Sequence, residues 1–358
     1  MPTTDIQNPG VQFLLQRNVE QSKIFCSEQS RMWKRQYREA HPTKIIVLKC
    51  SDGRLNLSLL TDTPPGILEP YRTIGGAFDI GWPFFESLIM ESVRQSASQH
   101  QNVLILVTYH WSVGDVKRGC RGFNNDIEAA KAYTRTFCGK LNMILAHLPH
   151  MVRAIQVGIE TDEDALTFHG ESSNGVFKTV EHLKQSDDEI LEGFRKLYPA
   201  LNEQMTVDLA TLALGNRRHV EHVRKNPKPL DDVFHKERVV VIGRGADWLH
   251  LPNFALIIGP YSYNLSEPLI IAAKILLENL TSGRVPQDEG VVLMISAAYR
   301  EADPHYIDMA RGMAIEKAHS LSTFAYDTVA QHVPELMPYV HMLKGTVDMQ
   351  TRLFTPLE

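Results

Sequence analysis

Three residues with metal and acid–base chemistry follow an apolar run early in the chain. The run Ile45–Leu48 leads to Cys50, Asp52 and Arg54, so a thiol, a carboxyl group and a guanidinium group occupy alternate positions. A thiolate binds transition metals, and an arginine that holds a carboxylate through two hydrogen bonds keeps it ionised and oriented. The pattern indicates one side of a metal site, with a hydrogen-bond acceptor two residues away.

A second apolar run, Val103–Val107, also leads to a metal-ligand residue, His110, and the loop after it contains Cys120. Two thiolates and one imidazole form a zinc-type donor set whose fourth position stays open for water. Such runs are typical of strands covered on both faces of a parallel sheet, where ligands bind at the carboxyl ends. We expect Cys50 and His110 at the ends of two neighbouring strands, with Cys120 as the third ligand.

The other cysteines and the clustered histidines are expected to have structural or surface roles. They are Cys26, Cys138, His147, His150, His219 and His222. His147 and His150 flank the end of an expected helix and would be ligands only by displacing Cys120. His219 and His222 have ligand-like spacing, but the helix around them is highly charged, which favours surface positions.

The composition is that of a large globular chain without nucleic-acid or membrane features. The 358 residues are 43% hydrophobic, which is enough for the cores of two or three domains. A formal net charge of −5 gives no basic footprint for nucleic acid, and no apolar segment approaches the roughly 20 residues of a membrane helix. The N-terminus lacks the pattern of a secretory signal, and four cysteines do not indicate a disulfide framework, so we expect a cytoplasmic protein.

The elements that must position these residues form an α/β chain with a mostly parallel sheet flanked by helices. We expect one or two helices between Phe13 and Arg38, strands over Ile45–Lys49 and Val103–His110, helices over Trp82–Ser98 and Asn125–Leu145, a strand pair over Val152–Glu160 and Asp164–His169, and helices within Val180–Arg224. The proline-containing segment Asn226–Leu230 indicates a boundary. The expected domains are a helical arm at 1–42, a metal-binding domain at 43–230 and a third segment at 231–358.

The third segment repeats the pattern of the metal-binding domain. Lys44–Leu57 aligns without a gap to Arg238–Leu251, Ile74-Gly75 matches Ile258-Gly259, and Val103–His110 matches Val291–Ala298. The apolar positions are retained, whereas the chemical groups are lost: Cys50 is replaced by Arg244, Asp52 by Ala246, Arg54 by Trp248 and His110 by Ala298. The sequence therefore predicts an internal duplication whose second copy is metal-free.

The motif Cys50-x-Asp52-x-Arg54, followed by His110 and Cys120, resembles the zinc signature of the β-class carbonic anhydrases. Most members have His-x-x-Cys in the ligand loop, whereas nine residues separate His110 from Cys120 here. The longer spacing is similar to that of the divergent carboxysomal, or shell, branch, which also carries a degenerate second copy of the fold. The segment Val157–Leu166 resembles that branch too, and the resemblance extends from about Thr43 to the C-terminus.

The resemblance implies a zinc enzyme that reversibly hydrates carbon dioxide to bicarbonate and a proton through a zinc-bound hydroxide. It implies Cys50, His110 and Cys120 as ligands of Zn²⁺, and Asp52 and Arg54 as catalytic residues that orient the metal-bound water. Three residues are expected to bind substrate: Gly75, Gly76 and Phe78. The implied architecture is a β-carbonic-anhydrase-like fold fused to its degenerate copy, a pseudo-dimer in one chain that pairs again into a homodimer or higher homo-oligomer.

Two other functions fit the same residues. Carbonyl sulfide or carbon disulfide could replace carbon dioxide at the same zinc site, because related enzymes change substrate by reshaping access. A non-catalytic scaffold or shell-associated protein is the second alternative, although the intact motif argues against it. The family resemblance would allow a carboxysome shell or Rubisco as partner and a carboxysome as location, but the short N-terminal arm gives this no support.

Overall fold

The computed structural model describes residues 3–171, 175–229, 235–244, 246–249, 251, 253–300 and 310–358. The chain divides into two compact units. The six-stranded unit consists of Met32–Cys50 and Leu55–Val233, and the five-stranded unit consists of Met1–Arg31, Ser51–Arg54 and Phe234–Glu358. Four residues that follow the first strand, Ser51–Arg54, thus belong to the unit that contains the C-terminal third.

The six-stranded unit is built on a mostly parallel sheet of order β2-β1-β3-β4-β5-β6. The strands are β1 (Lys44–Cys50), β2 (Leu68–Thr73), β3 (Val103–Trp111), β4 (Val152–Glu160), β5 (Ala165–His169) and β6 (Val176–Lys178). Strands β2, β1, β3 and β4 run parallel, and β5 and β6 are added antiparallel. Both β1 and β3 are buried along almost their whole length, which explains their continuous apolar sequence.

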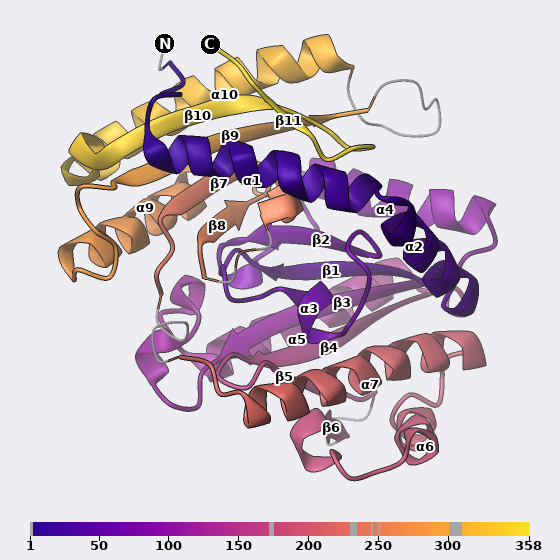
Figure 1. Ribbon diagram of the computed structural model, residues 1–358. Helices are drawn as coiled ribbons and strands as arrows, with labels where there is room; N and C mark the ends of the chain where they lie inside the picture. Colours follow the sequence, from indigo (N-terminus) through magenta and orange to yellow (C-terminus); the bar gives the residue numbers. More distant parts are fainter. Residues whose placement is uncertain are drawn as a thin grey trace. The chain divides into compact units, whose positions relative to one another are not determined.

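Helices cover this sheet and fix where its loops begin. They are α2 (Glu28–Ala40, which starts in the other unit), α3 (Leu57–Leu60), α4 (Pro83–Ser98), α5 (Ile127–Ile144), α6 (Asp187–Leu197) and α7 (Glu203–Lys225). The side chain of Asp126 caps α5 by accepting the N–H of Ala129. Helix α5 packs on β3 and β4, whereas α7 packs on β5 and α6 on β6 (Figure 1).

The five-stranded unit has a sheet of order β11-β10-β9-β7-β8. Its strands are β7 (Val239–Gly243), β8 (Ala255–Ile258), β9 (Val291–Tyr299), β10 (Val340–Asp348) and β11 (Phe354–Pro356), and its helices are α1 (Pro9–Cys26), α9 (Ser266–Thr281) and α10 (Arg311–His332). The N-terminal helix is part of this core, because Val11 and Leu14 are fully buried in it. The Asn18 amide joins α1 to the chain end by donating to the Arg352 carbonyl and accepting the Phe354 N–H.

The two sheets have the same strand order and register. In both, the first strand is flanked by the second and third, the fourth is parallel to the third, and the fifth is antiparallel to the fourth. A shift of 188 residues converts Val103 opposite Val152 into Val291 opposite Val340. The same shift converts Val157 opposite Phe168 into Gly345 opposite Pro356.

The expected strands at Ile45–Lys49, Val103–His110, Val152–Glu160 and Asp164–His169 are confirmed, as are the helices expected at Trp82–Ser98, at Asn125–Leu145 and within Val180–Arg224. Strands β2 and β6 were not expected. The match of Ile258 with Ile74 is wrong in register, because Ile258 lies opposite Ile242 as Tyr71 lies opposite Leu48. The end of the expected boundary, residue 230, and the side chain of Trp248 lie outside the described residues.

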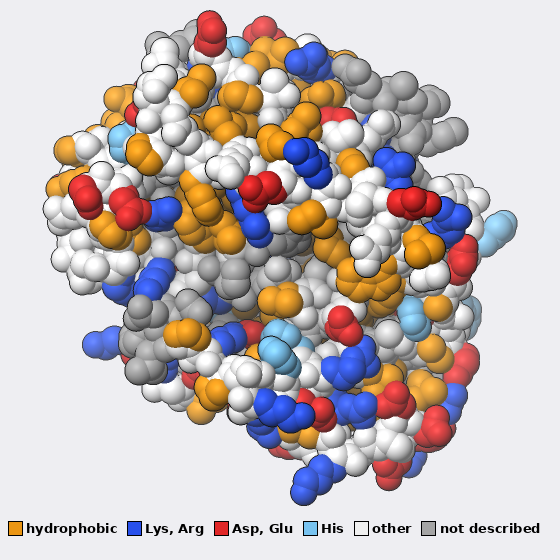
Figure 2. All heavy atoms as spheres, viewed as in Figure 1, with side chains coloured by type: hydrophobic (Ala, Val, Ile, Leu, Met, Phe, Trp, Pro, Cys, Tyr) orange, Lys and Arg blue, Asp and Glu red, His pale blue; other side chains and the backbone are white. Residues whose placement is uncertain are grey.

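On the face drawn in Figure 2, Lys and Arg side chains are interspersed with Asp and Glu and form no single basic surface among the described residues. In the described part of the chain, no helix combines the length and the apolar character needed to cross a membrane.

Candidate metal centre

Two adjacent parallel strands bring the first two candidate ligands to the same side of the six-stranded sheet, where the carboxyl-terminal ends of the strands lie. Cys50 is the last residue of β1, and His110 is the last but one of β3. The strands pair directly, with Ile45 opposite Leu104. Cys50 is 5% exposed and His110 is 1% exposed. The strand positions expected from the sequence are therefore confirmed.

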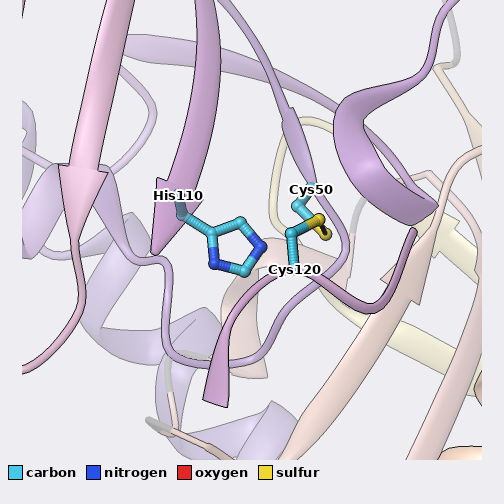
Figure 3. Close-up of side chains that lie close together, drawn as sticks. All are labelled: Cys50, His110 and Cys120. Atoms are coloured by element: carbon cyan, nitrogen blue, oxygen red, sulfur yellow. Dashed lines mark hydrogen bonds between the residues drawn. The ribbon is translucent and has the colours of Figure 1, made fainter. Parts of the chain in front are cut away.

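Cys120 lies in the loop after β3, which folds back to these strand ends. It follows the short helix η2 (Val116–Arg118) and precedes η3 (Arg121–Phe123), and its carbonyl oxygen accepts the N–H groups of Phe123 and Asn125 at 3.0 and 2.9 Å. Its Sγ atom lies 3.9 Å from Cys50 Sγ, with no disulfide between them. The ligand atoms of Cys50, His110 and Cys120 all lie within 4.8 Å of one another, and Figure 3 shows the imidazole facing the two sulfur atoms.

Asp162 fixes the long loop that carries Cys120. Its carboxylate accepts the Ser112 hydroxyl at 2.8 and 3.0 Å and the Gly114 N–H at 2.7 Å, and it pairs with Arg118 at 3.8 Å. A loop held at its start and at η2 loses less conformational entropy when a metal binds. The acidic segment after β4, which resembled the carboxysomal branch in sequence, therefore has a local structural role in shaping the ligand loop.

Glu160 supports the same turn from the end of β4. Its carboxylate accepts the N–H groups of Val113, Asp162 and Glu163 at 2.8–3.2 Å. Burial raises the pKa of Glu160, and these three N–H groups offset that rise only in part. The sequence signal was the run of acidic residues after a buried strand, but only the fold shows which loop they cap.

The glycine pair lies beside the ligand cluster. Gly75 and Gly76 form the short helix η1 (Ile74–Gly76) with φ angles of 71° and 64°, and the Gly75 N–H donates to Cys50 Sγ at 3.2 Å. A Cβ atom on Gly75 would lie 3.1 Å from the Phe123 ring. Glycine is required both for the positive φ and for the close approach, and the N–H group would stabilise a thiolate at Cys50.

Phe78 lies further along this segment, at a pocket of about 440 Å³. The lining residues are Phe78, Asp79, Ile80, Ala132, Tyr133, Thr136, Phe137 and Lys140. Phe78 is buried and stacks on Phe85, with 5.0 Å between ring centroids. None of the three candidate ligands lines this pocket.

Asp52 and Arg54 form the bidentate pair that their spacing predicts. Arg54 Nε donates to Asp52 Oδ1 at 3.0 Å and Nη2 donates to Oδ2 at 2.6 Å, while the Arg54 backbone N–H also bonds Oδ1 at 2.9 Å. Both side chains are buried and belong to the five-stranded unit. Along the chain, Asp52 follows Cys50 by two residues.

Sequence reasoning missed two residues beside this pair, of which His235 contacts Arg54 and Glu237 contacts His235. His235 Nε2 lies 3.2 Å from Arg54 Nη2, and His235 Nδ1 lies 3.1 Å from both carboxylate oxygens of Glu237. Glu237 is 0% exposed. The only available signal was the spacing His235-x-Glu237 just before a buried strand, which by itself does not point to Arg54.

The other cysteines and histidines singled out in the sequence stay outside the cluster in the part of the chain that the structure describes. Cys138 is buried in α5, and burial raises the pKa of its thiol to about 12, although Arg153 opposes the rise. His147, His150 and His222 are exposed. The expected surface position of His219 is wrong: its side chain is 12% exposed and pairs with Asp164 at 2.9 Å.

The equivalent strand ends of the five-stranded unit lack the ligands. Register places Ala298 where His110 lies, and Arg244 follows β7 where Cys50 ends β1. By contrast, two thiols and an imidazole, all buried and within one metal's reach, are the donor set that zinc prefers, and three ligands leave its fourth position open. The residues present therefore fit a zinc ion in the six-stranded unit.

Comparison with known proteins gives a distant relationship. No protein-family model matches the chain. Two curated proteins are similar: the carboxysome shell carbonic anhydrases of Prochlorococcus marinus strain MIT 9313 and of P. marinus subsp. pastoris strain CCMP1986, each 23% identical over 244 residues. The match covers 58% of this chain and 46% of each relative, so it spans less than half of their length. The chain is therefore a distant homologue of the carboxysome shell carbonic anhydrases.

Proposed function

We propose that the protein is a zinc-dependent carbonic anhydrase that reversibly hydrates carbon dioxide to bicarbonate and a proton. The observation that carries the proposal is the convergence of Cys50, His110 and Cys120 at one sheet edge, in a chain distantly homologous to enzymes of that name. The matching strand ends of the five-stranded unit carry Arg244 and Ala298 instead of Cys50 and His110. The fold therefore forms without these ligands, which argues that the cluster is not a by-product of the fold.

Each residue has a separate role in this proposal. Cys50, His110 and Cys120 hold the metal, which supplies the Lewis acidity that makes water nucleophilic near neutral pH. Asp52 accepts a hydrogen bond from the reacting water and so directs its lone pair toward carbon dioxide. Arg54 keeps Asp52 ionised and prevents it from turning toward the metal as a fourth ligand.

Substrate binding is assigned to the segment that follows β2. Gly75 lies next to the candidate ligands, because its N–H group donates to Cys50 Sγ. In this proposal Phe78, three residues further on, provides apolar contact for a small apolar molecule. Only the reaction is carried over from the relatives to this chain. A carboxysome location and a homodimer stay predictions. Light scattering on purified protein checks the homodimer.

The test combines metal analysis with two substrates. We expect one zinc per chain by mass spectrometry and stopped-flow hydration of carbon dioxide that is lost in His110→Ala, whereas His147→Ala, at an exposed histidine, retains both. A chain that binds no zinc would indicate the scaffold function. Zinc with hydrolysis of carbonyl sulfide or carbon disulfide, but no hydration of carbon dioxide, would assign the alternative enzyme.

A further inference from the structure

Four buried charged or polar side chains form a continuous row in the five-stranded unit. Glu237 contacts His235, His235 contacts Arg54, and Arg54 holds Asp52. The contact distances are 3.1, 3.2 and 2.6 Å, and all four residues are buried. The row therefore ends at the carboxylate that our proposed function places beside the reacting water.

The donors and acceptors of the row fix the proton on His235. Arginine has only donors, so Nε2 of His235 must accept from Arg54 and its proton must lie on Nδ1, where it donates to Glu237. Burial alone would raise the pKa of Glu237, but the facing His235 and the nearby Arg54 lower it below its ordinary value. Glu237 thus faces the Nδ1–H group of His235, and the contacts on the two sides of the ring together select one tautomer.

The row is not a second metal site. The ligand atoms of Asp52, His235 and Glu237 also lie within 4.8 Å of one another. However, the Arg54 guanidinium bonds Asp52 and lies against His235 Nε2, so a fixed cation already occupies the position that a metal would need. A metal there would face both the charge and the N–H groups of Arg54.

The backbone of the Asp52 segment is held by the same part of the chain. The N–H groups of Asn253 and Ile257 donate to the carbonyls of Gly53 and Ser51 at 3.0 and 3.2 Å, and the Gly53 N–H donates to Glu237 at 3.4 Å. A Cβ atom on Gly53 would lie 2.9 Å from the Ala255 carbonyl oxygen, so the fit tolerates only glycine. Residues 51–54 are therefore clamped along β8 and against Glu237.

We infer that His235 and Glu237 are positioning residues for the reaction. Resting on the proposed function, this assigns the five-stranded unit a role in the reaction: it holds the Asp52–Arg54 pair in its working orientation. His235 restrains rotation of the Arg54 guanidinium by accepting a hydrogen bond from Nη2. Glu237 fixes both the imidazole and the Gly53 backbone, so it positions the pair from two directions.

The first experiment measures hydration kinetics and zinc content for His235→Leu, His235→Gln and Glu237→Gln. We expect His235→Leu to retain one zinc per chain and to lose about 10-fold in kcat, the low end for residues that orient a metal site from outside. His235→Gln should retain most of the wild-type kcat, because its side-chain oxygen can replace the Nε2 acceptor. His222→Leu, at an exposed histidine, serves as the control. Unchanged kcat in His235→Leu would overturn the inference.

A double-mutant cycle distinguishes positioning from general stability. If His235 acts through Arg54, His235→Leu causes no further loss of kcat in an Arg54→Ala background, whereas independent structural damage would add. Additive losses would refute the inference.

A second readout needs neither metal nor activity. In metal-free protein labelled with ¹⁵N-histidine, we expect His235 to show the Nδ1–H tautomer. The His235→Gln spectrum assigns the signal. An active wild type with the other tautomer would refute the row and leave the proposed function intact. An inactive, zinc-loaded wild type with the expected tautomer would refute the function and retain only the row of contacts.

Discussion

The two sheets share a framework but differ at the ends of their strands. The strand order and directions match between β2-β1-β3-β4-β5 and β8-β7-β9-β10-β11. Over the last three strands of each, one constant shift in residue number also relates the register. The matching strand ends carry Cys50 and His110 in one sheet, and Arg244 and Ala298 in the other. The difference separates residues that the fold needs from residues that the proposed reaction needs, and the shared framework supports the internal duplication that the sequence predicts.

The largest expected difference between the sheets is metal binding. Cys50→Ser replaces a thiolate by a hydroxyl that stays protonated near neutral pH, so we expect loss of zinc and a fall of hydration to the uncatalysed rate. Arg244→Ser, the same change at the matching position, should leave zinc content and kcat unaltered. Mass spectrometry and stopped-flow assays check both, and loss of zinc in Arg244→Ser would show that the second sheet contributes to the metal site.

The Asp52–Arg54 pair tests whether the motif needs charge or geometry. Arg54→Ala should retain zinc and lose about 10- to 100-fold in kcat. Arg54→Lys keeps the charge but not the two parallel hydrogen bonds to Asp52, so its kcat should stay close to that of Arg54→Ala. Full activity in the lysine variant would mean that a nearby positive charge is sufficient.

The ligand loop provides the next smaller effect. Asp162→Asn removes the charge that pairs with Arg118 and weakens the cap on Ser112 and Gly114, so the dissociation constant for zinc should rise about 10-fold. Glu163→Gln is the matched control, because Glu163 pairs with Arg224 at the surface. Competition with a chelator measures both constants, and equal affinities for the two variants would contradict the role of Asp162.

The sequence was most informative where chemistry coincides with a local pattern. Cys50 and His110 were predictable because each follows a buried strand, and the parallel pairing that brings them together follows from those strands. Strand β2 was missed because it lies at the sheet edge and contains Pro70 and the polar residues Glu69 and Arg72, so no apolar run marks it.

Contacts between residues far apart in the sequence could not be predicted from local patterns. His235 and Arg54 are 181 residues apart in the chain, and nothing local in either segment indicates the other. The match of Ile74-Gly75 with Ile258-Gly259 failed for a related reason, since two residues carry too little information to set a register that the strand ladders decide.

Two glycines provide the smallest and most direct comparison. Gly75, beside Cys50, and Gly283, after α9, have φ angles of 71° and 72°. A Cβ atom on Gly283 would meet nothing within 4 Å, whereas on Gly75 it would meet Phe123 at 3.1 Å and the Gly122 backbone at 3.3 Å. Gly283→Ala should therefore cost only the left-handed backbone term, about 1 kcal/mol.

Gly75→Ala adds the steric contacts and should cost about 2 to 3 kcal/mol in the free energy of unfolding. Urea titrations of both variants measure the difference. Because the Gly75 N–H donates to Cys50 Sγ, any shift of this backbone also changes the ligand, so zinc affinity should fall in Gly75→Ala alone. Equal destabilisation of the two variants, with unchanged zinc affinity, would mean that the glycine beside the cluster serves only its turn.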